Sequence, residues 1–132
     1  MAIKLEVREL VNYGDARGPN FTIPVDALAF VGRLADVYLA CTKPNSIRGN
    51  HYHLRRREAL VVLPGSPWSL HWDEDENVAA QHRDFDGKHA VLILISPGAS
   101  HAMRNDGDSD LWFFAVSSEN YDPAESVTRK VV

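Results

Sequence analysis

The sequence has a single cysteine, Cys41, among its 132 residues, and it has no long apolar run. A lone cysteine cannot form an intramolecular disulfide, which agrees with a reducing compartment. The longest apolar runs, residues 59–63 and 90–95, are far shorter than the roughly 20 residues that a membrane-spanning helix needs. Residues 1–8 alternate charged and apolar side chains and lack the apolar core of a signal peptide. We therefore expect a soluble, cytoplasmic protein with no membrane partner.

An excess of basic charge is missing as well. Lys and Arg total 14 against 18 for Asp and Glu, and the formal net charge is −4. This balance provides no basic surface for nucleic acid, so small molecules or proteins are the expected partners. Repeats of about 20–50 residues and low-complexity segments are absent too. A chain of this length forms one domain, residues 1–132, and buries roughly two thirds of its unfolded surface.

Long helical periodicity is also lacking, whereas alternation of period two recurs along the chain. Gly, Pro, Asn and Asp separate the alternating segments, as tight turns require. Residues 25–34 form either a short helix or an irregular crossing. Many short strands joined by turns predict an all-β sandwich or barrel. The expected strands are residues 3–8, 36–42, 47–53, 58–63, 68–72, 78–85, 90–95, 101–104 and 111–117.

The most informative motif is a pair of histidines one residue apart, His51 and His53, followed by Glu58 and later by His101. Alternate residues of a strand point to the same face, so the pair faces one side together. Residues 54–57 are long enough to turn the chain, so that Glu58 begins the next strand and points inward. Neutral imidazoles and a carboxylate are suitable ligands for divalent zinc, iron, nickel, copper or manganese. These four residues are therefore candidate metal ligands; the alternative is that each His is a hydrogen-bonded wall residue.

Two longer patterns contain these residues. The spacing H-x-H-x4-E-x6-G runs from His51 to Gly65, and P-G-x-x-H-x3-N runs from Pro97 to Asn105. Both resemble the two motifs of the cupin superfamily. The resemblance implies an all-β double-stranded β-helix, the cupin jelly-roll barrel. It also implies a homodimer, because cupins of this kind usually pair through their sheets.

Two shorter segments narrow the resemblance. Residues 48–53, R-G-N-H-Y-H, and residues 119–123, E-N-Y-D-P, are similar to the C-terminal cupin domain of bacterial capsular polysaccharide assembling proteins. That domain is a metal-containing module that processes sugar nucleotides. The Arg-Gly-x-His pattern is also similar to that of the dTDP-4-keto-6-deoxyhexose 3,5-epimerases and the related 3,4-ketoisomerases. Those epimerases usually have Gln at the position of His53 and use no metal, so His53 favours a metal site or a ketoisomerase-like His pair.

The resemblance implies a metal-binding cupin of carbohydrate or polysaccharide biosynthesis that acts as an epimerase or isomerase on a nucleotide-linked 4-keto sugar. His51 has the base or ligand role, with His53, Glu58 and His101 as co-ligands; in a metal-free site, His51 and His53 act as acid and base. The cofactor is a divalent metal ion, with zinc as the first choice and iron, manganese or nickel as alternatives. Two other functions stay open: a metal-dependent dioxygenase, and a non-catalytic module that binds a sugar or another small ligand.

Three further residues are candidate substrate contacts. Arg48 can bind a nucleotide diphosphate, because a guanidinium makes bidentate contacts with phosphate oxygens. Tyr52 is a candidate proton donor, although its strand parity is opposite to that of His51 and favours a position facing away from the barrel interior. Asn105 either orients His101 or satisfies a turn.

Other polar and aromatic groups have structural interpretations. Residues 55–57, three consecutive arginines, predict a solvated turn, with phosphate capture as the alternative. Trp68, Leu70 and Trp72 alternate along one expected strand, which predicts that they fill the core and that His71 faces outward.

Overall fold

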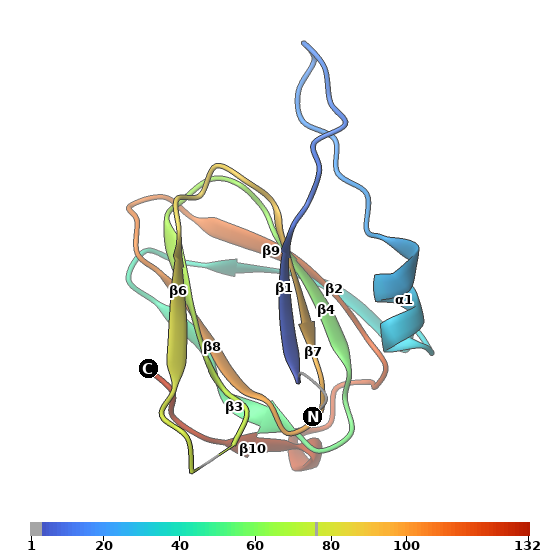
Figure 1. The fold of residues 1–132 in the computed structure, drawn as a ribbon, viewed down its shortest axis with the longest axis vertical. Coiled ribbons are helices and arrows are strands. Elements are labelled where there is room, and N and C mark those ends of the chain that lie inside the picture. The colour runs from blue at the N-terminus through green and yellow to red at the C-terminus, as the bar shows by residue number, and fades with distance from the viewer. Residues whose placement is uncertain (1–3, 76) are drawn as a thin grey trace.

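Two antiparallel five-stranded sheets pack against each other in the computed structural model, which describes residues 4–75 and 77–132 (Figure 1). The first sheet has the strand order β1-β7-β4-β9-β2, and the second has the order β10-β3-β8-β5-β6. This architecture is the all-β jelly-roll barrel that the cupin resemblance implies. The elements in chain order are β1 (Leu5–Glu9), α1 (Val25–Val31), β2 (Asp36–Thr42), β3 (Ile47–His53), β4 (Glu58–Val62), β5 (Trp68–Asp73), β6 (Gln81–Phe85), β7 (Val91–Ile95), β8 (Ser100–Asn105), β9 (Leu111–Ser117), the 3₁₀ helix η1 (Pro123–Glu125) and β10 (Ser126–Thr128).

The nine strands expected from the sequence all occur, with small shifts at their ends. Ile3, where the first expected strand begins, lies outside the described residues. β6 begins at Gln81, three residues later than expected, because the N–H of Val78 donates to the carbonyl of Asp75 in a turn. Residues 25–34, for which a helix and an irregular crossing were both possible, form α1, which ends at Val31 and is capped by Gly32 with a φ of 75°. The sequence did not predict η1 or β10.

The strand β4 shows how the core is divided between the two faces of the first sheet. Leu60 and Val62 point into the space between the sheets, whereas Ala59 and Val61 point to the outer face, where α1 covers them. Both faces are buried, which explains why the β4 sequence is a continuous apolar run after Glu58. None of the helices in the described part of the chain is long and apolar enough to cross a membrane.

The aromatic strand β5 lies in the second sheet with the predicted orientation. Trp68 and Leu70 are buried in the core between the sheets, and Trp72 packs against it. His71 points the other way, where its Nε2 lies 2.9 Å from the hydroxyl of Ser69 and its ring stacks on that of His82. The prediction that His71 faces outward is confirmed.

The pairing of β3 with β8 sets the geometry of the candidate site. A bulge between Gly49 and His51 shifts the register, and after it His51 lies directly opposite His101. Asn50, the residue in the bulge, has a φ of 56°, a left-handed conformation that Asn tolerates better than most residues. The bulge therefore determines which side chains of β3 face the interior.

Candidate functional site

A cavity of about 750 Å³ opens between the two sheets, within the usual size range of small-molecule sites. Its walls come from β2, β3, β4, β5, β8, β9 and the C-terminal segment (residues 119–132). Apolar side chains such as Leu60, Leu70 and Phe113 line one part of it, and polar groups converge on another. This combination is typical of a site that holds a ligand against an apolar wall and orients it with a few polar contacts.

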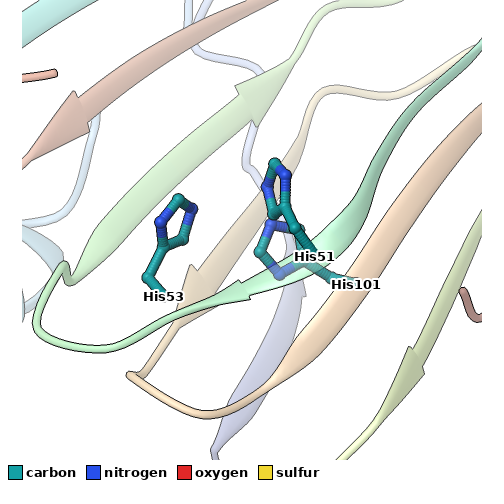
Figure 2. Close-up of side chains that lie close together, drawn as sticks. All are labelled: His51, His53 and His101. Atoms are coloured by element: carbon teal, nitrogen blue, oxygen red, sulfur yellow. The ribbon is translucent and has the colours of Figure 1, made fainter. Parts of the chain in front are cut away.

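Three histidines converge on the cavity (Figure 2). His51 and His53 come from β3, and His101 comes from the neighbouring β8. Their ring centroids are 4.7 Å apart for His51 and His53, 4.8 Å for His51 and His101, and 5.8 Å for His53 and His101. One nitrogen of each ring lies within 4.8 Å of the others. Strand parity and the β3–β8 register together bring the rings to one place.

Hydrogen bonds fix the orientation of two of the three rings. The Nδ1 of His53 lies 2.5 Å from Oε1 of the buried Glu125, and the Nδ1 of His101 lies 2.9 Å from the carbonyl oxygen of Ala99. A carbonyl oxygen and an ionised carboxylate only accept hydrogen bonds, so both Nδ1 atoms donate. His51 is half-buried and is the most accessible of the three.

Glu58 is buried beside the histidines and pairs with an arginine. Its Oε1 accepts a hydrogen bond from Nη1 of Arg56 at 3.1 Å and lies 3.3 Å from Nε2 of His53. Glu58 is not within the group formed by the three imidazoles, so the structure brings together three of the four expected metal ligands and places the fourth next to one of them. Arg56 itself is buried, and the expectation of a fully solvated turn at residues 55–57 is wrong for this residue.

The surroundings shift the pKa values of these groups in different directions. Burial, followed by the charges of His101 and His53, lowers the pKa of His51 to about 4. Burial opposes protonation of His53 too, but hydrogen bonds and attraction from Glu58 and Glu125 raise its pKa above the usual value. Two adjacent imidazoles thus have opposite tendencies: the surroundings favour the neutral form of His51 and the protonated form of His53.

The pKa values of the remaining buried groups follow from the same causes. Burial lowers the pKa of His101, although the charge of Glu58 opposes this shift. For Glu58, burial favours the neutral form, but the interactions with His53, His101 and Arg56 outweigh it and lower the pKa to about 2. Glu58 is therefore an anion buried among cations.

The three candidate substrate contacts have different positions. Arg48 lines the cavity and donates from Nε and Nη2 to the carbonyl oxygen of Cys41, at 2.9 and 2.7 Å. Tyr52 pairs with Val127 of β10 and is not among the cavity-lining residues, in agreement with its strand parity. Asn105 also lies outside the cavity lining and is completely buried.

The contacts of Asn105 decide between its two possible roles. Its Nδ2 donates to the carbonyl oxygens of Thr42 and Ser109, and its Oδ1 accepts from the Ser66 hydroxyl and the Gly107 N–H. These bonds hold a turn together. The orientation of the His101 imidazole is fixed instead by its hydrogen bond to the carbonyl of Ala99. Substrate binding by Asn105 does not agree with this geometry, because its polar atoms are already paired.

Sequence reasoning missed Glu125, which belongs to η1. The signal for this turn was present, because Asp122 at the N-cap, Pro123 at the first position and Glu125 at the third are typical of a helix start. Asp122 accepts the N–H of Ala124 in this role. Nothing in the sequence connects the glutamate to a histidine 72 residues earlier.

Several solved structures share the fold. A 3′-monoepimerase from Streptomyces bikiniensis in complex with dTDP-quinovose aligns with a TM-score of 0.79 at 19% identity, covering 95% of this chain and 69% of that one. A sugar 3,4-ketoisomerase from Thermoanaerobacterium thermosaccharolyticum in complex with TDP aligns with a TM-score of 0.70 at 17% identity, covering 96% and 89%. At these identities the likeness is one of fold.

A capsular polysaccharide assembling protein from Staphylococcus aureus aligns with a TM-score of 0.67 at 20% identity, covering 92% of this chain and 34% of that one. A comparison with curated proteins finds no match. A family model described as the polysaccharide biosynthesis C-terminal domain matches residues 26–129, most of the sequence. The chain therefore belongs to the family of polysaccharide biosynthesis C-terminal domains.

Proposed function

We propose that this protein is an epimerase or isomerase that acts on a nucleotide-linked 4-keto sugar. The observation that carries the proposal is the convergence of three imidazoles on a cavity of about 750 Å³. The similar epimerase and ketoisomerase structures, which hold dTDP-quinovose and TDP, support this class of substrate.

Epimerisation and keto migration both begin with removal of a proton next to a carbonyl group. In epimerisation a proton then returns to the opposite face of the same carbon, and in keto migration it is added to the neighbouring carbon. His51 is the accessible imidazole of the cluster, and in its neutral form it takes that proton. His53 lies between Glu58 and Glu125, which favour its protonated form, so its Nε2 supplies a proton. With ring centroids 4.7 Å apart, the two imidazoles can serve neighbouring atoms of one sugar ring.

Arg48 is the candidate for the diphosphate. A guanidinium has five N–H donors, and the bonds to the carbonyl of Cys41 involve Nε and Nη2, which leaves the Nη1 donors available. These bonds fix the side chain at the cavity wall, and Arg48 is exposed to solvent. Both features suit an arginine that receives an anionic ligand from solvent.

We further propose that the three imidazoles are a binding site for a divalent metal ion. Zinc is the first choice, and iron, manganese or nickel are the alternatives. The residues fit this role, because the Nδ1–H groups of His53 and His101 are held by oxygen atoms and their Nε2 atoms remain as ligands. The Nε2 of His53 is buried, and the carboxylate beside it is that of Glu58, whose Oε1 lies 3.3 Å away. A bound metal supplies Lewis-acid polarisation of a substrate carbonyl. His51 would then be a ligand, and in the metal-free protein it is the base.

Metal analysis separates these two roles. Elemental mass spectrometry on tag-free protein should find stoichiometric metal in the wild type and little in the variants His51→Ala and His101→Ala. The matched control is His82→Ala, since His82 is exposed and lies on the outer face of the second sheet. No metal in the wild type after reconstitution would contradict the metal proposal and leave the acid–base pair.

Deuterium exchange tests the reaction itself. In D₂O, the wild type should incorporate deuterium next to the carbonyl of a dTDP-linked 4-keto-6-deoxyhexose, and His51→Ala should lose this exchange. NMR measures the incorporation. Absence of exchange in the wild type would contradict the proposed function. Oxygen consumption with bound iron would then indicate a dioxygenase, and ligand binding without turnover would indicate a binding module.

We also propose a homodimer. β2 is an edge strand of the first sheet, and Val37 and Leu39 on its outer side are exposed, together with Trp112 of the adjacent β9. Two such edges can associate around a two-fold axis and cover these side chains. Light scattering after size exclusion should give twice the monomer mass for the wild type and the monomer mass for Leu39→Glu. A monomeric wild type would contradict the proposal.

A further inference from the structure

Glu125 is buried and makes four hydrogen bonds to residues 53–56. It is 1% exposed. Its Oε2 accepts the backbone N–H groups of Arg55 and Arg56, each at 3.0 Å, and its own backbone carbonyl accepts the N–H of Leu54 at 2.8 Å. Its Oε1 lies 2.5 Å from Nδ1 of His53. The residue therefore links the C-terminal segment to the turn between β3 and β4 and to one imidazole of the cavity.

The two backbone amides help to determine which nitrogen of the His53 ring faces Glu125 as a proton donor. Both amide N–H groups donate to Oε2, and such bonds stabilise the ionised form of the carboxylate, in which Oε1 carries no proton. The Oε1 of the same carboxylate is then an acceptor for His53, whose Nδ1 must donate. This leaves Nε2 as the nitrogen directed at Glu58 and at the cluster.

The chain on both sides of Glu125 is also fixed. Before it, Asp122 caps η1 by accepting the N–H of Ala124. After it, β10 pairs with β3, so that Ser126 lies opposite His53. At the end of the chain, Oδ1 of Asn50 accepts the N–H groups of residues 131 and 132. Asn50 is the bulge residue of β3, so the strand that carries the histidines also holds the segment that carries the glutamate.

We propose that Glu125 is a positioning residue, which fixes the ring orientation and the Nδ1 proton of His53 and thereby presents Nε2 to the cavity as a proton donor or metal ligand. The consequence for turnover rests on the proposed function, whereas the position of the proton does not. The role differs from that of a contact residue, because Glu125 acts through the imidazole.

The substitution Glu125→Gln tests the proposal with almost no change in shape. The glutamine Oε1 is still needed by the amides of Arg55 and Arg56, so its NH₂ group faces His53 and donates to Nδ1. The imidazole then carries a proton on Nε2 and none on Nδ1. Glu119→Gln is the matched control, since Glu119 lies in the same segment but its side chain does not line the cavity.

The proton position is measured by ¹⁵N NMR of the histidine side chains in metal-free protein at one fixed pH. We expect a protonated Nδ1 of His53 in the wild type and in Glu119→Gln, and an unprotonated Nδ1 in Glu125→Gln. Zinc titration should show an affinity about 10–100-fold lower for Glu125→Gln than for the control, the usual effect of losing such a partner.

Two results would overturn the proposal. One is a folded Glu125→Gln protein in which His53 keeps its proton on Nδ1. The other needs no variant and therefore does not depend on its folding: a wild-type spectrum in which Nδ1 of His53 carries no proton. Wild-type protein that shows the expected spectrum but neither turns over a keto sugar nor binds zinc would contradict the proposed function and leave the positioning role intact.

Discussion

A Cβ atom added to Gly49 would stand 2.5 Å from the carbonyl oxygen of His101. The backbones of β3 and β8 approach closely here, immediately before the bulge that directs His51 into the cavity. Gly49 also has a φ of 111°, which side chains rarely adopt. The glycine of the R-G-N-H segment is therefore a requirement of the strand pairing that holds two histidines opposite each other.

Gly49→Ala should destabilise the protein by at least about 2 kcal/mol, because steric overlap and backbone strain both contribute. It should also weaken zinc binding, since β8 must shift at His101 to accommodate the methyl group. Gly32→Ala is the control, because Gly32 has a φ of 75° but open space around it. Chemical denaturation and zinc titration measure the two effects. Equal losses of stability in both variants, with zinc binding unchanged, would contradict the steric explanation.

The stability of the protein should depend on the ionisation of His71. Burial, with the charges of Arg104 and His82, lowers the pKa of this imidazole, and Asp106 and Asp84 only partly oppose the shift. The unfolded chain therefore binds a proton at this imidazole more readily than the folded protein does. The resulting contribution to the free energy of unfolding is present above the unfolded pKa of about 6.5 and is lost as the pH falls below it.

Denaturation of the wild type and of His71→Gln across this pH range measures that contribution. The free energy of unfolding should fall less steeply below pH of about 6.5 in the variant. Asn77→Ala, at an exposed residue without a titratable side chain, provides the control and should follow the wild type. A variant with the same pH dependence as the wild type would show that His71 is protonated equally in both states.

Asn105→Ala should reduce stability and leave ligand binding intact. The substitution leaves the hydroxyl of Ser66, the N–H of Gly107 and two carbonyl groups without their partner, so a loss of about 2–4 kcal/mol is expected. Thermal unfolding and titration with a dTDP sugar measure the two properties. Asn77→Ala, at an exposed position, should change stability by less than about 0.5 kcal/mol. A stable variant that no longer binds the nucleotide would restore the substrate role.

The alternation of residues predicted most of the barrel, because strand parity is a local property. It placed His51 and His53 on one face, and it placed Glu58 inward with Leu60 and Val62. The bulge at Asn50 did not disturb this parity, since it precedes both histidines.

Residues whose roles depend on distant partners were not predictable in the same way. Glu125 contacts an imidazole 72 positions away, and no periodicity encodes that distance. Arg56 belongs to a run of three arginines, for which a solvated turn is the usual expectation. Its burial depends on contacts with Glu58, Glu125 and the carbonyl of Glu119, two of which lie far away in the sequence. For Asn105 both alternatives were open, and its partners at the end of β2, at Ser66 and in the turn at residues 107–109 decided between them.

The pair of Arg56 and Glu58 supports a final prediction. Both side chains are nearly inaccessible, with 8% and 4% exposure, and their atoms approach to 3.1 Å. Removal of one partner of a buried pair leaves an uncompensated charge and costs about 3–5 kcal/mol. For Arg56→Met we expect the lower end of this range, because His53 still lies 3.3 Å from Glu58 and supplies part of the missing positive charge.

The double variant Arg56→Met with Glu58→Gln removes the buried anion as well and should recover at least half of the loss, as measured by urea denaturation with both single variants alongside. The expected coupling has a physical reason: the free energy lost in Arg56→Met comes from the stranded carboxylate more than from the missing hydrogen bond. Additive losses in the double variant would show instead that Arg56 stabilises the turn mainly through its bond to the carbonyl of Glu119. In that case Glu58 would owe its ionised form to the histidines, and its place beside the three imidazoles would be independent of the arginine.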